Sequence, residues 1–260
     1  MTTTEVSTQL VLTEINNGVL TITINRPAQR NAVNREVAVA VAAALDELDS
    51  DSSLSVGVLT GAGGTFSAGM DLKAFANGET PILPGRGFGG VTQAVVRKPL
   101  IAAVEGWALG GGFEMTLGCD LIVAAEDAKF GLPEVKRGLI AGEGGVIRLS
   151  KRIPYHVAVK VLLTGEPLPA VDAKQYGLVS ELTAPGAAVA GAQELAARIA
   201  ANAPLALARV KEVLRQTQGL NDTDAFTRQA ENASSLLTSE DAHEGALAFA
   251  EKRAPVWRGR

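Results

Sequence analysis

The chain has 260 residues, of which 47% are hydrophobic and 20% are charged, and its formal net charge at neutral pH is −4. This composition is typical of a folded globular protein and argues against a disordered chain. The acidic balance argues against a nucleic-acid partner, because a general nucleic-acid-binding surface needs clustered basic residues that neutralise phosphates.

The beginning of the chain, MTTTEVSTQ, lacks the basic and apolar regions of a signal peptide. No apolar run in the chain approaches the roughly 20 residues that a membrane-spanning helix needs, because glycine and charged residues interrupt each one. The single cysteine, Cys119, cannot form an intramolecular disulfide and requires no oxidising compartment. We therefore expect a cytoplasmic protein with no membrane partner.

Strands, glycine-rich turns and helices alternate through the first half of the chain. Two β-type runs in residues 10–24 flank Asn17-Gly18, a pair that suits a hairpin turn. Asn34 is placed to cap a helix that continues through residue 51. Further strands are predicted at residues 54–61, 100–106 and 120–126, and a further helix at residues 110–118. The pattern indicates an α/β fold with parallel strand pairing.

Two later segments differ from this alternation. Residues 77–90, NGETPILPGRGFGG, are rich in glycine and proline and have almost no periodicity, which predicts a mobile loop that can cover a site. From about Pro185 the hydrophobic pattern has the period of helices as far as about residue 253. We therefore divide the chain into a core, residues 1–185, and a helical region that mediates oligomerisation, residues 186–260.

The last nine residues, KRAPVWRGR, contain four basic residues and no acidic one. A solvated tail is the simpler interpretation of such a run. The alternative is a contact with an anionic ligand, since clustered cations attract phosphates. Sequence alone leaves both open.

Three common kinds of functional site are not matched by the sequence. Residues 61–66, GAGGTF, begin like a dinucleotide-binding fingerprint, but Phe66 occupies the position of the last glycine. Ser67 lacks the preceding glycine of a nucleophile elbow, and the two histidines are more simply interpreted as helix-surface residues. No cluster of histidine and cysteine has the spacing of a metal site. We expect neither a metal nor a separate cofactor.

Two glycine-rich segments predict a site for negative charge. FSAGMDL, residues 66–72, and GWALGGGFE, residues 106–114, each place glycine where a strand ends. Glycine leaves a backbone N–H facing a cleft with no side chain in the way, and in the second segment the N–H also lies at a helix N-terminus, where the dipole favours negative charge. Two such donors that converge on one oxygen form an oxyanion hole, each worth about 2.7–4 kcal/mol. The simpler alternative is that the glycines only allow a strand to turn into a helix.

Two glutamates make that alternative less favourable. Glu114 falls in the first turn of the helix after the triple glycine, and Glu134 follows Pro133 after the next strand. Taken singly, each is an ordinary first-turn acid that complements a helix dipole. Taken together beside an oxyanion hole, two carboxyl groups match what hydration of a double bond requires, which is activation of a water and protonation of a carbon.

These segments resemble the enoyl-CoA hydratase/isomerase (crotonase) family, and the resemblance covers the chain from about Leu10 to Arg260. It is carried by FSAGMDL, GWALGGGFEMTLGCD, AKFGLPEVKRGLI and FAEKR, in this order and spacing. The resemblance implies a crotonase-like spiral of β-β-α turns with a C-terminal helical trimerisation region, assembled as a homotrimer or hexamer. It also implies an enoyl-CoA hydratase that converts a 2-enoyl-CoA thioester to a 3-hydroxyacyl-CoA, with CoA as part of the substrate. The ending and residues 84–90 look most like the crotonobetainyl-CoA (carnitinyl-CoA) branch.

The resemblance also assigns roles to individual residues. The oxyanion-hole donors fall on the backbone N–H groups of Met70 and Gly111, so we expect a side chain at Gly111 to crowd the acceptor oxygen. Glu114, as general base, and Glu134, as proton donor, act on one water. The contacts with CoA fall on Gln29, Arg30, Ala68, Asp71, Leu72 and Lys73, and on Phe249 and Lys252, which reach the nucleotide of a neighbouring subunit.

One residue departs from the pattern of many hydratases. Where they have Pro-Gly-Ala-Gly-Gly, this chain has Ala-Gly-Glu-Gly-Gly at residues 141–145, which puts a carboxylate near the acyl end. Glu143 either turns outward or pairs with Arg148 or Lys136 beside an apolar pocket, or it lines that pocket and favours a cationic acyl group. In the second case Trp107 can add a cation–π contact if it faces the same space.

Three alternatives to hydration of a plain enoyl-CoA stay open. A carnitinyl-CoA dehydratase-type activity fits the glycine-rich loop and Glu143. Double-bond isomerisation needs only one glutamate to carry a proton between carbons. A more distant alternative is a non-catalytic acyl-CoA-binding or RNA-binding relative, against which the two glutamates and the acidic balance both argue.

Overall fold

The computed structural model describes residues 9–260, so residues 1–8, where we expect no signal peptide, lie outside the described part. In chain order the elements, with η for a 3-10 helix, are β1 (Val11–Asn16), β2 (Val19–Ile24), η1 (Pro27–Gln29), α1 (Arg35–Ser50), β3 (Val56–Gly61), α2 (Leu72–Ala76), β4 (Ile82–Leu83), β5 (Gly87–Phe88), β6 (Leu100–Val104), β7 (Trp107–Leu109), α3 (Gly111–Gly118), β8 (Leu121–Ala125), β9 (Lys129–Gly131), η2 (Pro133–Arg137), α4 (Gly145–Arg152), α5 (Tyr155–Thr164), β10 (Leu168–Pro169), α6 (Ala170–Gln175), β11 (Glu181–Thr183), α7 (Ala188–Ala200), α8 (Pro204–Gln216), α9 (Asp222–Ser234) and α10 (Glu240–Glu251). No helix among the described residues has the length and hydrophobicity that crossing a bilayer requires.

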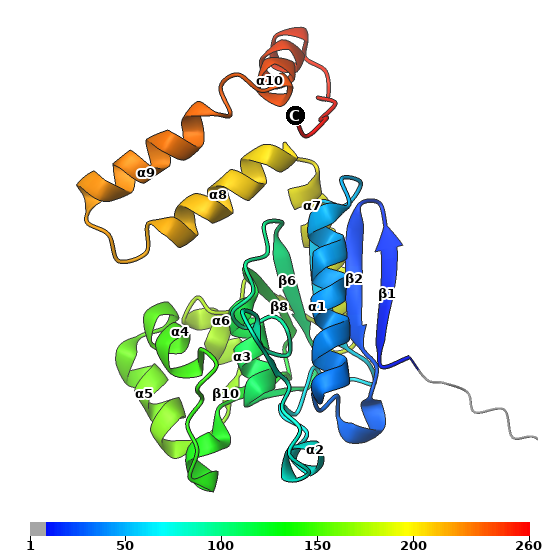
Figure 1. The fold of residues 1–260 in the computed structure, drawn as a ribbon, viewed down its shortest axis with the longest axis vertical. Helices are drawn as coiled ribbons and strands as arrows, with labels where there is room; N and C mark the ends of the chain where they lie inside the picture. Colours follow the sequence, from blue (N-terminus) through cyan, green and yellow to red (C-terminus); the bar gives the residue numbers. More distant parts are fainter. Residues whose placement is uncertain (1–8) are drawn as a thin grey trace, which may run out of the picture.

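A six-stranded sheet forms the centre of the core, in the order β1-β2-β3-β6-β8-β11 (Figure 1). β1 and β2 are antiparallel across the Asn17-Gly18 turn, and every other neighbouring pair is parallel. α1 packs on one face of the sheet and α7 on the other. Because both faces are covered, all six residues of β3 are buried. The predicted α/β fold with parallel pairing is confirmed.

A second layer of short strand segments follows the long parallel strands. β7 pairs with β9 in parallel, and Ser67 forms a parallel bridge with Ala108 of β7. The chain therefore repeats a long strand, a short strand segment and a helix three times: first β3, residues 66–68 and α2, then β6, β7 and α3, and finally β8, β9 and η2. This repeat is the spiral of β-β-α turns that the resemblance implied.

The glycine-rich segment 77–90, which we predicted to be a mobile loop that can cover a site, is packed against the core at its end. β4 and β5 form a two-stranded hairpin within it. Phe88, at the end of the hairpin, and Val91, which follows it, are buried, with 3% and 2% exposed. Gly87 shows why glycine is needed, since its φ is +70° and a Cβ there would lie 2.3 Å from Thr92 Oγ1.

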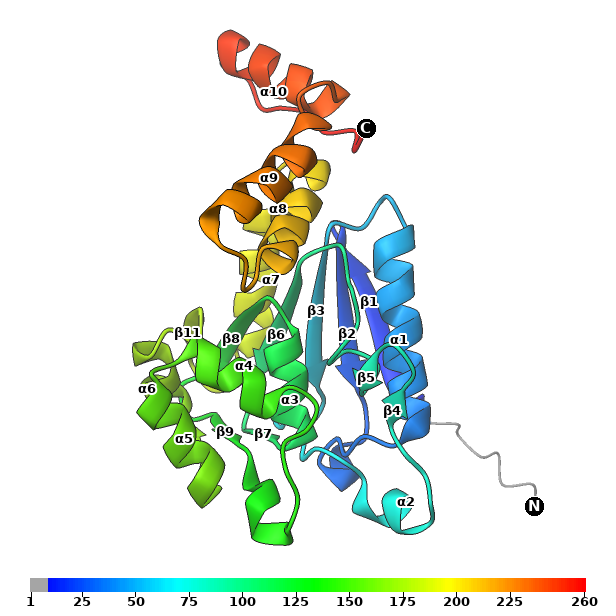
Figure 2. The same ribbon diagram turned by 60° about the vertical axis from the view of Figure 1, so that its left-hand side comes forward.

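α7 belongs with the sheet, although it lies in the region 186–260. Its Ala188, Ala192 and Ala196 are fully buried in a cluster with Val58 of β3 and Ile101 of β6. The helices that project from the core are α8, α9 and α10, as the two ribbon views show (Figures 1 and 2). The boundary that we placed at residues 185–186 therefore falls before a helix of the core, and the projecting region begins with α8.

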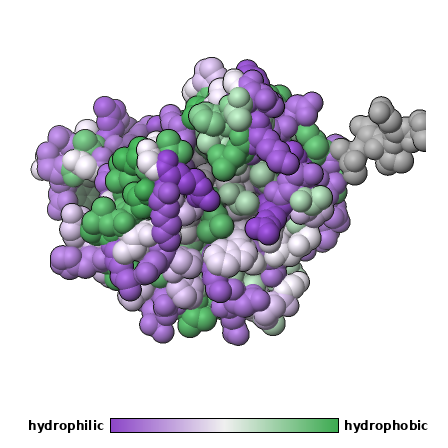
Figure 3. Space-filling model, turned by 90° about the horizontal axis from the view of Figure 1, so that it is seen from below, coloured by the Kyte–Doolittle hydropathy of each residue, from purple (hydrophilic) through white to green (hydrophobic). Residues whose placement is uncertain are grey.

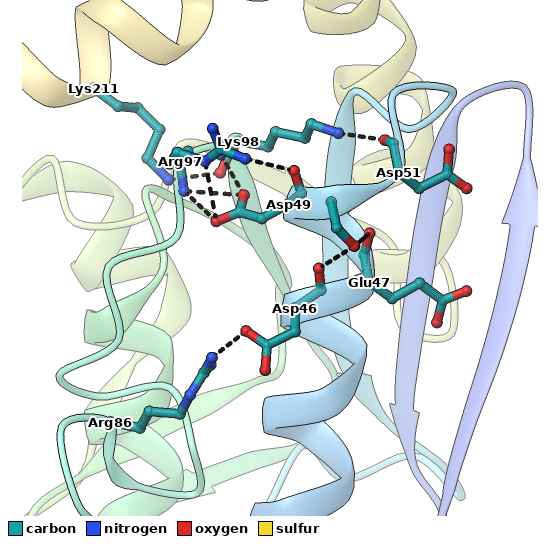
Figure 4. Close-up of polar contacts among 9 residues, drawn as sticks. Asp46, Glu47, Asp49, Asp51, Arg86, Arg97, Lys98 and Lys211 are labelled. Carbon is teal, nitrogen blue, oxygen red and sulfur yellow. Dashed lines mark hydrogen bonds and ion pairs between the residues drawn. The ribbon is translucent and has the colours of Figure 1, made fainter.

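α8 is fastened to the core through Lys211 (Figure 4). Its Nζ donates to the carbonyl oxygen of Lys98 at 2.7 Å and forms an ion pair with Asp120 at 2.7 Å. Asp49, near the end of α1, accepts hydrogen bonds from the backbone N–H groups of Arg97 and Lys98 at 2.9 and 3.0 Å. α1, the connection into β6 and α8 are thus joined by charge-assisted hydrogen bonds.

Candidate active site

Three parallel segments bring the candidate catalytic residues together. The N–H of Ser67 donates to the carbonyl oxygen of Trp107 at 3.0 Å, and the N–H of Leu109 donates to that of Ser67 at 2.9 Å. On the other side of β7, the N–H of Gly110 donates to the carbonyl oxygen of Gly131 at 2.8 Å. Since parallel segments end at the same edge, the residues that follow residues 66–68, β7 and β9 lie close together. These are the predicted site residues Met70, Gly111, Glu114 and Glu134.

The two predicted oxyanion donors are neighbours. The N–H of Val33 donates to the carbonyl oxygen of Gly69 and the N–H of Asp71 to that of Val33, at 2.8 and 2.9 Å. These bonds hold the peptide groups on both sides of Met70 and leave its own N–H without a backbone acceptor among residues 9–260. A methyl group built on Gly69 would lie only 3.2 Å from the backbone nitrogen of Gly111, the second donor.

Each of the three glycines at residues 110–112 has a different neighbour that leaves little room for a side chain. A Cβ on Gly110 would lie 3.1 Å from Oε1 of Glu134, and one on Gly112 would lie 2.5 Å from the carbonyl oxygen of Ser67. A Cβ on Gly111 would lie 2.4 Å from the ring of Phe88. We expected a side chain at Gly111 to crowd the acceptor oxygen, but the first atoms it meets belong to this ring. Phe88 was not predicted as a site residue, and the one signal that could have indicated it is an aromatic residue within a glycine-rich loop.

Glu114 is buried in the first turn of α3 and is 4% exposed. Its Oε1 accepts hydrogen bonds from the backbone N–H groups of Glu143 at 2.7 Å and Gly145 at 2.9 Å. Burial, together with the negative charges of Glu134 and Glu143, raises the pKa of Glu114 to about 7, although the two N–H donors oppose this change. A carboxyl group with this pKa can exchange a proton near neutral pH.

Glu134 lies at the start of η2 and is half-buried. Burial also raises its pKa. Its Oε2 is inaccessible to solvent and has no hydrogen-bond partner among the described residues. Buried polar atoms in proteins are nearly always hydrogen-bonded. Glu134 lies next to Gly110, and the N–H groups of Met70 and Gly111 have no backbone acceptor among residues 9–260, so the unpaired carboxylate oxygen indicates a place for a ligand.

Within the described residues Glu143 forms neither of the ion pairs predicted for it, and whether it lines the acyl pocket stays a prediction. Its Oε2 accepts hydrogen bonds from the backbone N–H of Phe88 and from Thr92 Oγ1, both at 2.9 Å. Among residues 9–260 it forms no ion pair with Arg148 or Lys136, and Arg148 donates to the carbonyl oxygen of Thr92 instead. The sequence carried no signal for Thr92.

The ring of Trp107 already forms a cation–π contact within the protein. Lys129 Nζ lies 5.0 Å from the centre of that ring. Trp107 also begins β7, whereas the catalytic candidates follow the end of this strand. A second cation bound at the same ring would be repelled by Lys129, so the structure does not support the predicted use of Trp107 for a cationic acyl group.

Six of the predicted CoA contacts lie where η1 meets the start of α2. The N–H of Ala68 donates to the carbonyl oxygen of Arg30 at 2.9 Å, which joins the two segments. Asp71 caps α2, accepting from the N–H groups of Lys73 and Ala74, and its carboxylate pairs with Arg26 at 2.9 Å. The six residues are Gln29, Arg30, Ala68, Asp71, Leu72 and Lys73. The Asp71 carboxylate is therefore used within the protein, which leaves its backbone as the part available to a ligand.

Phe249 and Lys252 lie on α10, in the projecting region at the opposite end of the molecule from α2 (Figure 1). Phe249 is 88% exposed. Lys252 ends the helix with a φ of +54°, which is uncommon for a residue other than glycine. Arg30 shares this left-handed conformation, with a φ of +52°.

The charges of the basic tail are largely neutralised by α10 itself. Arg253 pairs with Glu244 at 2.5 Å, and both Arg258 and Arg260 pair with Glu240, at 3.5 and 3.1 Å. Lys252 is the one basic residue of the tail that forms no ion pair within the described residues. The tail is thus mostly a self-paired surface, with one cation left for another partner.

Exposed hydrophobic side chains lie beside the site, on the face of the molecule that carries α2 and η2. Viewed from below, hydrophobic residues gather around a hollow (Figure 3). Exposed hydrophobic side chains come from both elements and the residues after them: Leu72, Phe75, Val135, Leu139 and Ile140. Such a surface suits an apolar group of a ligand, since burying it removes apolar area from water.

Comparison with known proteins identifies relatives of this arrangement. A family model for enoyl-CoA hydratase/isomerase matches residues 14–260. A carnitinyl-CoA dehydratase from Salmonella typhi is 42% identical over 254 residues, which cover 94% of this chain and 97% of that protein. The crystal structure of an enoyl-CoA hydratase from Mycobacterium tuberculosis H37Rv superposes with a TM-score of 0.95 at 52% identity, covering 96% of this chain and 99% of that one. A carnitinyl-CoA hydratase from Mycobacterium avium superposes with a TM-score of 0.79 at 46% identity, covering 98% of this chain and 100% of that one.

Proposed function

This chain belongs to the enoyl-CoA hydratase/isomerase family, and we propose that Glu114 and Glu134 perform its reaction, the addition of water to a 2-enoyl-CoA thioester. The protein is an enzyme, a hydratase that acts on acyl-CoA. The observation that carries the residue assignment is the pair of glutamates with raised pKa values next to two unused backbone N–H groups. A binding protein without catalytic activity has no need for such a pair.

The chemistry follows from the charge that develops during the addition. As water attacks C3 of the enoyl group, negative charge moves to the thioester oxygen, where the N–H groups of Met70 and Gly111 stabilise the enolate. Glu114, held by its two N–H donors, takes a proton from the water, and Glu134 delivers a proton from its unpaired Oε2 to C2. The proton gained by Glu114 replaces the one lost by Glu134, so the pair begins and ends with one shared proton.

A neutral enoyl-CoA is the substrate class that the site favours. A carnitinyl-CoA dehydratase-type activity is the second candidate, because relatives at about two-fifths identity carry that name. That activity needs a group that recognises a quaternary ammonium. A quaternary ammonium has no N–H and is recognised by negative charge or by an aromatic face. The carboxylate of Glu143 is directed to the N–H of Phe88 and to Thr92 Oγ1, and the ring of Trp107 already faces Lys129, which weakens the attraction that each residue offers to such a group.

The test is to compare crotonyl-CoA with crotonobetainyl-CoA at matched concentrations. We expect crotonyl-CoA to be converted to 3-hydroxybutyryl-CoA with the higher kcat/KM, because placing the cationic group of crotonobetainyl-CoA against the hydrophobic rim of the site costs desolvation free energy. A higher kcat/KM for crotonobetainyl-CoA would replace this assignment with the second candidate. Conversion of a 3-enoyl-CoA to a 2-enoyl-CoA without hydration would indicate an isomerase.

We further propose a cytoplasmic homotrimer or a pair of trimers. Large hydrophobic side chains on the projecting helices are exposed in the single chain: Val210, Leu214, Phe226, Leu237 and Phe249. Several large exposed hydrophobic side chains on helices that project from the core suit an interface between subunits, where they would be buried. In such an assembly α10 of one subunit can reach the CoA of its neighbour, where Arg30 and Lys252 would supply cations for the phosphates.

Lys252→Ala should raise KM for crotonyl-CoA about tenfold, because a hydrogen bond to a charged group contributes about 1.5–3 kcal/mol. The change in kcat should be small, since Lys252 touches no reacting atom. Arg258→Ala is the matched control, because Arg258 is a basic residue of the same tail that pairs with Glu240. Light scattering should give a mass of three or six chains for both variants. An unchanged KM in Lys252→Ala would remove this residue from the CoA site, and a monomeric mass for the unmodified protein would overturn the proposed assembly.

A further inference from the structure

Glu143 contacts two different parts of the site, one through its backbone N–H and the other through its side chain. Its backbone N–H is one of the two donors that hold Oε1 of Glu114, at 2.7 Å. The other donor, the N–H of Gly145, lies two residues farther along the same turn, at 2.9 Å. The position of this turn, residues 141–145, therefore fixes the orientation of the Glu114 carboxylate.

The side chain of Glu143 links the turn of residues 141–145 to the loop of residues 87–93, which is distant in the sequence. Its Oε2 accepts hydrogen bonds from the N–H of Phe88, from Thr92 Oγ1 and from Gln93 Nε2, at 2.9, 2.9 and 3.1 Å. Gly87 leaves room for this oxygen, since a Cβ there would lie 2.6 Å from it. Three donors on one carboxylate oxygen form a strong, charge-assisted contact between residues 87–93 and residues 141–145.

The loop of residues 87–93 packs in turn against the triple-glycine turn, residues 110–112. The ring of Phe88 occupies the space beside Gly111, where any Cβ would collide with it at 2.4 Å. One residue later, a Cβ on Gly89 would lie 2.7 Å from Met115 Sδ of α3, the helix that carries Glu114. The loop therefore packs against the helix that supplies both a backbone donor and a catalytic glutamate.

We propose that Glu143 is a positioning residue for hydration, whose carboxylate holds the 87–93 loop against the 110–112 turn and thereby fixes both Phe88 and the N–H donors of Glu114. This inference rests on the proposed function, because it assigns Glu143 a role in that reaction. Loss of the carboxylate releases the turn that carries the Glu143 N–H, so the general base loses its fixed orientation. Small displacements of catalytic groups reduce rates by on the order of 10².

The test compares four variants in the full-length protein. Glu143→Ala should lower kcat for crotonyl-CoA by about 10-fold to 100-fold with a much smaller change in KM. Glu143→Gln should recover most of this loss, because the amide oxygen can accept the same hydrogen bonds without the charge. Thr92→Val removes one donor and should lower kcat less than Glu143→Ala. Arg86→Ala is the matched control, since it releases the same loop from Asp46 of α1 and leaves Glu143 in place (Figure 4).

Hydrogen–deuterium exchange at residues 87–93 measures how strongly Glu143 holds this loop, independently of catalytic activity. Exchange there should be faster in Glu143→Ala and near normal in Glu143→Gln. Unchanged exchange in Glu143→Ala, or an equal loss of kcat in Glu143→Ala and Arg86→Ala, would overturn the proposal. If the unmodified protein fails to hydrate crotonyl-CoA, the proposed function is wrong, and the exchange measurement still decides whether Glu143 holds the loop.

Discussion

Replacing either Glu114 or Glu134 with glutamine should lower kcat for hydration of crotonyl-CoA by at least about 10². Acid–base assistance contributes about 10²–10⁴ to such reactions, and an amide can neither take nor deliver the proton. The amide oxygen of Glu114→Gln can still accept the N–H groups of Glu143 and Gly145, so the geometry of the site is retained. The variants should bind CoA with near-normal affinity. Near-normal hydration in either variant would remove that residue from the mechanism.

The pH dependence of kcat/KM follows from the shared proton. Burial and the charge of Glu134 raise the pKa of Glu114 to about 7, so the pair keeps one proton until about that pH, and hydration uses the form in which this proton is on Glu134. Above that pH both carboxyls are ionised and no donor remains. At low pH both are protonated and no base remains. We therefore expect a bell-shaped profile that declines above about pH 7, and a rate that rises steadily into alkaline solution would contradict the shared proton.

Thermal denaturation provides a check that the Glu114 variant is folded. Burial raises the pKa of Glu114 above its ordinary value of 4.5 to about 7, so the folded state favours the protonated form. The stability that this form provides is present below pH 4.5 and is lost as pH rises through 7. Glu114→Gln has no carboxylate to bury, so its Tm should exceed that of the parent at pH 8 and differ little at pH 5.

The sequence predicted those parts of the fold that depend on local signals. Asn17-Gly18 marked the hairpin turn, and Asn34 does cap α1, with its side chain accepting the N–H of Val37 at 3.0 Å. The order of strands, glycine-rich turns and helices predicted the parallel sheet. β7 and β9 were not predicted, because each has only three residues, too few to show a period of two.

The candidate site was predictable only as a set of chain positions. Glycine at the ends of strands placed Met70 and Gly111, and a glutamate after each turn placed Glu114 and Glu134. The contact of Glu143 with Phe88 joins residues that are 55 positions apart in the chain. Neither residue lies in a local sequence pattern that specifies the other. The contact therefore depends on the tertiary structure, which brings the two loops together.

Gly69→Ala should reduce hydration of crotonyl-CoA by at least about 10³, the upper end of the loss caused by removing one oxyanion-hole donor. The new methyl group would lie 3.2 Å from the nitrogen of Gly111, close to where an oxygen bound to that N–H must sit. It would also lie 2.6 Å from the carbonyl oxygen of Leu109, which displaces the peptide that carries the N–H of Met70. Both donors are therefore affected by one substitution.

The Gly69→Ala variant must be shown to be folded, because the substitution also strains the backbone. Gly69 has a φ of +88°, and a left-handed backbone costs an L-residue roughly 1–2 kcal/mol. The 2.6 Å approach to the carbonyl oxygen of Leu109 adds to this cost, so a cooperative thermal transition is measured alongside activity. Met70→Ala is the matched control, because it changes the side chain beside the same donor and keeps the backbone N–H, and its loss should not exceed about tenfold. Binding of CoA should persist in Met70→Ala, since this change keeps the backbone of Ala68 and Asp71, which are proposed to hold CoA. A larger loss in Met70→Ala than in Gly69→Ala would show that the Met70 side chain, rather than the backbone beside Gly69, makes the contact that hydration requires.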